Sequence, residues 1–231
     1  FGGLVALKEV EMEVRPGEVV GLIGPNGAGK TTLLSVISGF YRPDSGRVVF
    51  DGHDITGLAP YRVAKLGLAR TFQLVRPLSR MTVWENVATA ALMRGYSLPE
   101  ARERAGHILQ LVELYPRRRV YAGSLTLGER KLLELARALA TEPSLLLLDE
   151  VAAGLTPVEH RSLIEVLTRI RDAGVTLVAV EHVMQVVMSV ADRLVVLHYG
   201  QVIAQGTPGE VAQNPQVIEA YLGQGEVDGR G

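Results

Sequence analysis

The chain contains no cysteine among its 231 residues. Disulfides and thiolate metal sites are therefore excluded, and the composition fits a reducing cytosol. Charge of one sign is not in excess either, because the formal net charge is −1, so we predict no binding of nucleic acid. The longest aliphatic runs, 145–148 and 175–180, have the length of buried strands and fall short of the roughly 18 to 20 residues of a membrane helix. The chain begins at Phe1 without methionine or a signal peptide, so we expect a short N-terminal piece to be missing.

One glycine-rich stretch organises the rest of the chain. It reads Gly24-Pro25-Asn26-Gly27-Ala28-Gly29-Lys30-Thr31 and fits the P-loop pattern G-x-x-x-x-G-K-[ST]. An apolar segment precedes it at 19–23, and a predicted helix continues from Thr32. In such a turn, backbone N–H groups and the helix N-terminus bind phosphate. Lys30 then reaches the β- and γ-phosphates and the Thr31 hydroxyl ligates Mg²⁺. A chance match is the alternative, but the flanking segments favour a nucleotide site.

Two carboxylates, Asp149 and Glu150, follow the aliphatic run 145–148. Because parallel sheets bind ligands at the carboxyl ends of their strands, Asp149 is predicted to hold Mg²⁺. Glu150 is predicted to be the general base that polarises the attacking water. Taken alone, the pair is equally well an ordinary strand end, and the upstream P-loop favours the functional interpretation.

Three further residues or segments are weaker candidates. His182 follows the next predicted strand, which places it at the same sheet edge as Glu150, although a lone histidine is more often structural. Gln73 is unremarkable by itself. At 125–129, Thr126 and Gly128 open a predicted helix and form a candidate anion site. Helix capping by Ser124 or Thr126 is the alternative there, and the sequence does not separate the two.

The order of elements predicts an α/β fold. Residues 4–14 alternate in polarity and predict a half-buried strand, and a second strand at 46–50 ends in an Asp51-Gly52 hairpin turn. Residues 74–123 read as a helical insertion, with a capping-box start at Ser97. From residue 124 onward strands alternate with helices, which predicts a parallel sheet covered on both faces beside an antiparallel layer. We therefore expect one domain over 1–231 with a helical subdomain at about 74–123.

These motifs, in this order and over essentially the whole chain, resemble the ATP-binding subunit of ABC transporters. The resemblance implies an ABC ATPase fold that binds ATP and Mg²⁺. It makes 24–31 the Walker A motif, 125–129 the signature, Glu150 the catalytic base and His182 the switch histidine. Gln73 becomes the Q-loop residue, a further ligand of the metal beside Thr31 and Asp149. Phe1 maps onto the aromatic residue that stacks on adenine.

The resemblance also implies partners. Two such subunits pack head to tail, as a homodimer or with a paralogue, so that Thr126 and Gly128 contact the partner's ATP. Residues 74–87, from Leu74 to Val87, contact membrane-spanning permease subunits, and a periplasmic or extracellular solute-binding protein acts indirectly. The subunit lies peripherally on the cytoplasmic face of the inner membrane.

Within this family, the stretches 1–7, 39–46, 68–73, 187–193 and 214–223 are similar to ATP-binding subunits of branched-chain amino acid importers. The lipopolysaccharide-export ATPase is also similar in places. Departures from the family pattern stand at Leu127, Glu129, Val151 and Thr156. Glu129 is expected to weaken binding of a γ-phosphate unless its side chain points away. Two rivals are a soluble ABC module without transport and a P-loop kinase.

Overall fold

The computed structural model describes residues 3, 5–73 and 76–225. The strands are β1 Val19–Ile23, β2 Val49–Phe50, β3 His53–Asp54, β4 Leu68–Arg70, β5 Leu145–Asp149, β6 Thr176–Val180, β7 Arg193–His198 and β8 Gln201–Gly206. The α-helices are α1 Lys30–Ile37, α2 Pro60–Lys65, α3 Val83–Leu92, α4 Leu98–Leu111, α5 Leu127–Leu139, α6 Pro157–Asp172, α7 Met184–Val190, α8 Pro208–Ala212 and α9 Pro215–Gly225. Two short 3-10 helices are η1 Tyr115–Arg117 and η2 Ala122–Ser124.

A six-stranded sheet with the order β4-β5-β6-β1-β7-β8 forms the centre of the molecule. The strands from β4 to β7 are parallel, and β8 adds an antiparallel edge through the turn at Tyr199 and Gly200. The carboxyl ends of β1, β5 and β6 consequently lie along one edge. The residues that follow these strands include the glycine-rich turn, Glu150 and His182, so the topology alone brings them close together.

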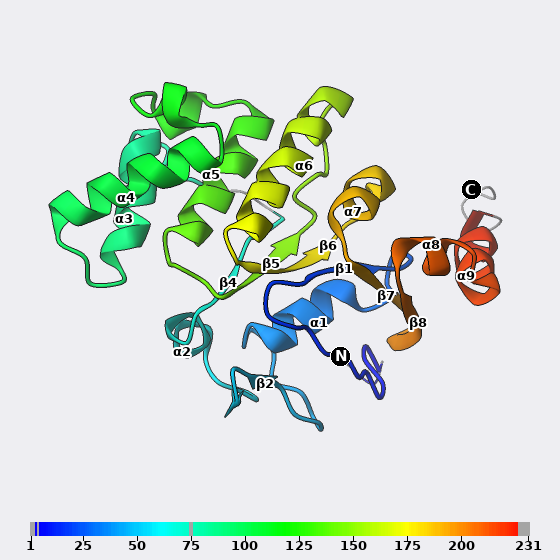
Figure 1. Cartoon of the computed structure of the whole chain (residues 1–231). Coiled ribbons are helices and arrows are strands. Elements are labelled where there is room, and N and C mark those ends of the chain that lie inside the picture. Colours follow the sequence, from blue (N-terminus) through cyan, green and yellow to red (C-terminus); the bar gives the residue numbers. More distant parts are fainter. Residues whose placement is uncertain (1–2, 4, 74–75, 226–231) are drawn as a thin grey trace.

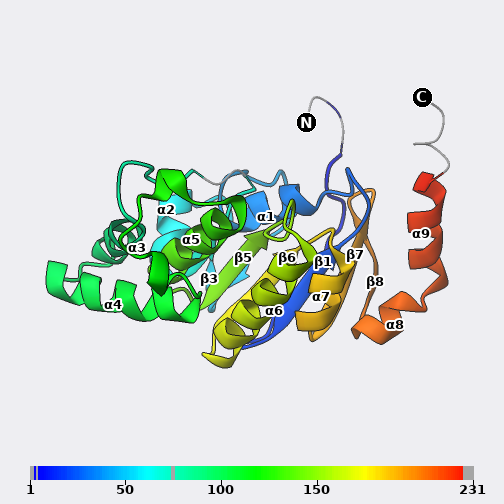
Figure 2. The same ribbon diagram turned by 90° about the horizontal axis from the view of Figure 1, so that it is seen from above.

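The sheet is buried on both faces, as its aliphatic strands require. Along β5, Leu146 and Leu148 belong to the core beneath α5 and α6, whereas Leu147 points to the opposite core, beside Leu34 of α1. This alternation is the two-residue period of a strand with an apolar layer on each side. Figure 1 shows α5, α6 and α7 on one face and α1 on the other, and Figure 2 shows the same layers from above.

The segment 76–123 is mainly helical in the part that the structure describes. Helices α3 and α4 pack on each other and on α5, away from the strands (Figure 1). The helix start predicted at Ser97 is confirmed, because the Glu100 carboxylate accepts hydrogen bonds from the Ser97 N–H at 2.8 Å and from its hydroxyl at 2.7 Å. An isolated bridge between Thr82 and Tyr121 closes the segment.

Two predictions about strands need correction. No strand is assigned in the described residues of 4–14, so that prediction is wrong. The alternation of polarity was nevertheless a true signal of burial, since Val10, Met12 and Val14 are half-buried against the core that faces α1. The strand predicted over 46–50 is confined to Val49–Phe50, which pairs with β3 across the predicted turn.

At the carboxyl end, α9 continues to Gly225, and 226–231 lie outside the described residues. None of the helices within the described ranges has the length and apolar character needed to cross a bilayer.

Candidate nucleotide-binding site

The turn between β1 and α1 has a backbone that only glycine adopts at two positions. Gly24 has φ +147°, and a Cβ added there would lie 2.0 Å from the carbonyl oxygen of Leu197. Gly29 has φ +101°, and its Cβ would lie 2.7 Å from the carbonyl oxygen of Ala6. Any side chain at these positions would therefore collide with backbone, which explains the two fixed glycines of the motif.

The first turn of α1 is open to an anion. The N-cap residue is Gly29, which has no side chain that could cap the helix. The first turn carries no acidic residue. The N–H groups at a helix N-terminus lack intrahelical partners and carry partial positive charge. Lys30, Thr31 and Thr32 all line a cavity of about 430 Å³ at this end of the helix. This arrangement suits a phosphate group.

Lys30 is buried, and its ammonium group points back into the turn. Nζ donates hydrogen bonds to the carbonyl oxygens of Gly24 at 2.6 Å and Pro25 at 2.9 Å. Burial lowers the pKa of Lys30, while the nearby charges of Glu150 and Asp149 act to raise it. In this conformation Lys30 stabilises the glycine-rich turn through these two hydrogen bonds. The same turn is the predicted phosphate site.

Glu150 lies between two other predicted site residues. Its Oε2 accepts a hydrogen bond from Gln73 Nε2 at 2.7 Å, and its Oε1 lies 3.0 Å from His182 Nε2. Glu150 has φ +51°, a left-handed conformation that costs an ordinary residue about 1 kcal/mol or more. The Lys131 ammonium donates to the Glu150 carbonyl oxygen at 2.9 Å. The fold thus brings Gln73, Glu150 and His182 together at one sheet edge.

The cavity collects most of the predicted nucleotide-binding residues. It is lined by Val5, Ala6, Asn26, Gly27, Ala28, Gly29, Lys30, Thr31, Thr32, Glu150, His182 and Tyr199. Asp149, Gln73, Thr126 and Gly128 are not among its lining residues. Phe1 lies outside the described residues, as do Leu74 and Val75, so adenine stacking by Phe1 stays a prediction.

The segment 125–129 is a helix cap in this structure. The Thr126 hydroxyl accepts the Glu129 N–H at 3.3 Å, and the Glu129 carboxylate accepts the Thr126 N–H at 2.9 Å. Glu129 also forms an ion pair with Arg117 Nε at 2.8 Å. The carboxylate is therefore turned back onto its own helix start. Contact of Thr126 and Gly128 with a partner's ATP remains a prediction.

Gly128 is closely covered by another helix cap. A Cβ there would lie 2.4 Å from Oε1 of Glu159, whose carboxylate caps α6 through the N–H and hydroxyl of Thr156 at 2.8 and 2.9 Å. A side chain at 128 would therefore displace the Glu159 carboxylate from its place at the start of α6.

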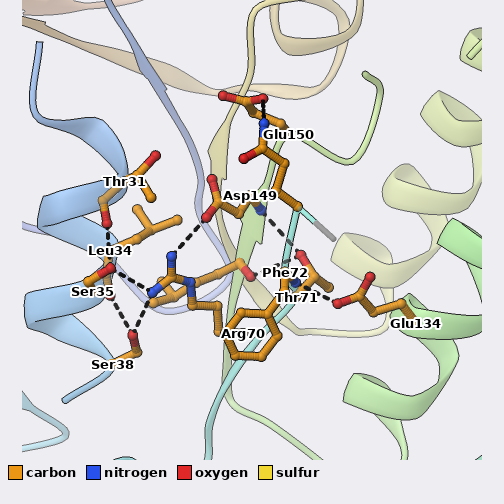
Figure 3. Close-up of polar contacts among 12 residues, drawn as sticks. Thr31, Leu34, Ser35, Ser38, Arg70, Thr71, Phe72, Glu134, Asp149 and Glu150 are labelled. Carbon is orange, nitrogen blue, oxygen red and sulfur yellow. Dashed lines mark hydrogen bonds and ion pairs between the residues drawn. The ribbon is translucent and has the colours of Figure 1, made fainter. Parts of the chain in front are cut away.

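Arg70 is the site residue to which sequence reasoning assigned no role. It forms a buried ion pair with Asp149, with NH2 and Oδ2 2.8 Å apart (Figure 3). The two residues are 79 positions apart in the chain, and no local pattern links them. Arg117, in the run Arg117-Arg118-Arg119, is a second residue without a predicted role, and it is half-buried and paired with Glu129.

The donors at this edge fit Mg²⁺. Within the described ranges no group of three or more His, Cys, Asp or Glu side chains could hold a metal by itself. Magnesium bound with a nucleotide needs only one or two carboxylates, because phosphates and water complete its shell. The Thr31 hydroxyl and the Asp149 carboxylate are hard oxygen donors of this kind.

Comparison with known proteins identifies the family. Residues 7–153 match the family model of the ABC transporter, which is more than half of the chain. The chain belongs to the ABC transporter family. This ABC ATPase also matches a model described as branched-chain amino acid ATP-binding cassette transporter over residues 201–227.

Several relatives are similar over nearly the full length of this ABC ATPase. The high-affinity branched-chain amino acid transport ATP-binding protein BraF of Pseudomonas aeruginosa is 41 % identical, with 97 % of this chain and 94 % of BraF covered. LivG of Escherichia coli, described in the same words, is 39 % identical with the same coverage. The crystal structure of the ADP conformation of MJ1267, an ATP-binding cassette of an ABC transporter, has a TM-score of 0.87 and 35 % identity, covering 96 % of this chain and 94 % of MJ1267. The predicted fold class is confirmed, and the chain is an ATP-binding, ATP-hydrolysing subunit.

Proposed function

We propose that this ABC ATPase powers an importer of branched-chain amino acids. The observation that carries the proposal is the match of residues 201–227 to the branched-chain amino acid transporter model, at the carboxyl end that lies outside the general ABC match. The relatives BraF and LivG, which carry that description, support it over 97 % of the chain. Export of lipopolysaccharide, a soluble module and a P-loop kinase are not favoured.

The residues at this sheet edge have different proposed roles in ATP hydrolysis. Glu150 accepts a proton from the water that attacks the γ-phosphate, and His182 and Gln73 orient that water and the phosphate. Lys30 and the N–H groups of the first turn of α1 bind the phosphates. Thr31, Asp149 and Gln73 are the proposed holders of Mg²⁺, which would neutralise phosphate charge.

Binding of ATP is proposed to join two subunits. One subunit supplies the P-loop side of each nucleotide, and Thr126 and Gly128 of the other supply the second side, in a homodimer or with a paralogue. Dimeric cassettes among the structural neighbours, such as MJ0796 with a TM-score of 0.79 and 27 % identity, support this arrangement.

The remaining partners are proposed from the family context. Residues 74–123 act as a helical subdomain, and 74–87 contact the membrane-spanning permease subunits. A solute-binding protein delivers the amino acid on the far side of the membrane. The ATPase is peripheral on the cytoplasmic face.

The test combines co-purification with uptake. From detergent-solubilised source membranes, the tagged chain should bring down two multi-spanning subunits and a paralogous ATPase. Deleting its gene should abolish high-affinity uptake of leucine, isoleucine and valine, and wild-type protein but not Glu150→Gln should restore it. Recovery of soluble proteins alone, or normal uptake in the deletion strain, would refute the importer.

A further inference from the structure

Arg70 ends β4 with its guanidinium inside the protein, where it contacts two other elements. NH2 forms the ion pair with Asp149 Oδ2, while NH1 donates to the hydroxyls of Ser35 at 3.0 Å and Ser38 at 3.1 Å, both near the carboxyl end of α1 (Figure 3). The side chains of Arg70 and Asp149 are only 7 % and 4 % exposed. One guanidinium therefore joins the end of β5 to the helix that follows the glycine-rich turn.

The contacts of Arg70 continue to Thr31. The Ser35 hydroxyl, which accepts a hydrogen bond from Arg70, itself donates to the carbonyl oxygen of Thr31 at 2.7 Å. A continuous chain of polar contacts thus runs from Asp149 through Arg70 and Ser35 to Thr31. Its two ends are the residues proposed to ligate Mg²⁺.

Aromatic rings restrict the guanidinium further. Its central carbon lies 5.7 Å from the ring centroid of Phe40 and 5.4 Å from that of Phe72. The two rings meet edge to face, with centroids 5.5 Å apart. A planar guanidinium packed against both rings has less rotational freedom than the ammonium group of a lysine would have.

Burying a charged arginine costs free energy, and that cost is not explained if the side chain only fills space. A buried ion pair is often no more stabilising than apolar side chains of the same volume. Here Nε of Arg70 is also buried without a hydrogen-bond partner among the described residues. Stability alone is therefore a poor explanation for an arginine at this position, whereas precise placement of Asp149 is a good one.

The segment that carries Arg70 also holds the rest of the sheet edge. The Thr71 hydroxyl accepts the N–H of Asp149 at 3.2 Å, and Gln73 holds the Glu150 carboxylate. The backbone N–H of Phe72 donates to Glu134 of α5. Both carboxylates at the end of β5 are thus positioned by residues 70–73.

We propose that Arg70 is a positioning residue for the metal site. It fixes the direction of the Asp149 carboxylate through Oδ2, and through Ser35 it connects Asp149 to Thr31, the other residue that would hold Mg²⁺. This inference rests on the proposed function, because it assumes that Asp149 and Thr31 hold the metal. Partners of this kind, which orient a metal ligand without touching the metal, change metal affinity by about 10- to 100-fold when they are removed.

The experiment measures the Mg²⁺ requirement of nucleotide binding, separately from turnover. A fluorescent ADP analogue is titrated with and without EDTA, and then Mg²⁺ is titrated at fixed nucleotide. Arg70→Met should raise the half-saturating Mg²⁺ concentration about 10- to 100-fold and leave metal-free affinity within about twofold. Arg70→Lys, which keeps the charge but not the fork, should give an intermediate increase. Arg62→Met removes an exposed arginine from α2 and should behave as wild type.

A comparison in an Asp149→Asn background makes the result decisive. In an Asp149→Asn background, Arg70→Met should have no further effect on the Mg²⁺ requirement, because the group that it positions is gone. Should Arg70→Met fail to fold by circular dichroism, Arg70→Lys carries the same measurement.

Equal losses with and without Mg²⁺ would show a merely structural arginine and overturn the proposal. An unchanged or lowered Mg²⁺ requirement in the folded variants would overturn it as well. Wild-type protein that binds no nucleotide in either condition would instead refute the proposed function, so the two failures are distinguishable.

Discussion

The side-chain amide of Gln73 donates a hydrogen bond to Glu150, with Nε2 and Oε2 2.7 Å apart. The other carboxylate oxygen faces His182 Nε2 at 3.0 Å, so both oxygens are engaged. An ionised carboxylate has about four lone-pair sites, so it can still accept a proton from water while both contacts persist. Gln73 and His182 therefore fix the direction of the Glu150 carboxylate.

Glu150→Gln tests the assignment of the base. The amide cannot accept the proton, but it keeps the size of the side chain and its place between Gln73 and His182. We expect ATP binding to persist, steady-state phosphate release to fall about 100- to 10,000-fold, and an ATP-bound dimer to accumulate in size-exclusion chromatography. Hydrolysis at the wild-type rate would rule Glu150 out as the base.

Lys30→Ala tests the phosphate site. Removing a charge-assisted hydrogen bond of about 1.5 to 3 kcal/mol should weaken ATP binding by roughly 10- to 100-fold. The ammonium also braces Gly24 and Pro25, so circular dichroism must confirm that the variant folds. Lys65→Ala, on exposed α2, is the matched control and should bind ATP normally in the same calorimetric titration. Wild-type affinity in Lys30→Ala would contradict the proposed role.

We expect Glu129 not to weaken ATP-dependent dimerisation, although it places a negative charge in the signature. Its carboxylate is paired with Arg117 and with the Thr126 N–H. Glu129→Gln should therefore change the ATP concentration needed for dimerisation by less than about twofold. Arg117→Ala leaves the carboxylate unpaired and should raise that concentration several-fold, more so at low salt. Dimerisation is measured by light scattering in the Glu150→Gln background, and a large gain with Glu129→Gln would show that the charge does face the phosphate.

The raised pKa of Glu181 should make the stability of the fold depend on pH. Burial, with a smaller contribution from the charge of Glu150, raises its pKa from 4.5 to about 7, although the Ala152 N–H and the Lys131 charge act in the opposite direction. Between those pH values the unfolded chain releases a proton that the folded chain retains. The free energy of unfolding attributable to Glu181 therefore falls as pH rises from 4.5 to 7, by on the order of 3 kcal/mol, and is level above that range.

Urea unfolding of Glu181→Gln between pH 4.5 and 8 measures this contribution. Relative to wild type, the variant should gain stability as pH rises through the window, because its amide does not ionise. Glu219→Gln, exposed on α9, should show a constant difference from wild type. A Glu181→Gln difference that is also constant with pH would contradict a raised pKa.

Much of the fold could be predicted because its signals are local. The glycines at 24 and 29 are required by the backbone of a single turn, and the helix start at Ser97 depends on Glu100, three positions later. The aliphatic strands could be assigned in order, since burial on both faces needs continuous apolar runs. The prediction of a strand at 4–14 was wrong because alternating polarity indicates only burial. Hydrogen-bonded pairing depends on a neighbouring strand that the sequence does not reveal.

By itself, then, the sequence determined the glycine-rich turn, the order of the strands along the chain and the residue types at their carboxyl ends. Only the tertiary structure decided that Arg70 holds Asp149, that Arg117 neutralises Glu129, and that Glu181 is buried beside Lys131. The physical reason is the distance along the chain. A turn or a cap is stabilised by neighbours that any reader of the sequence can see, whereas the charge state and direction of a buried side chain are set by groups that meet only when the sheet and its helices have packed.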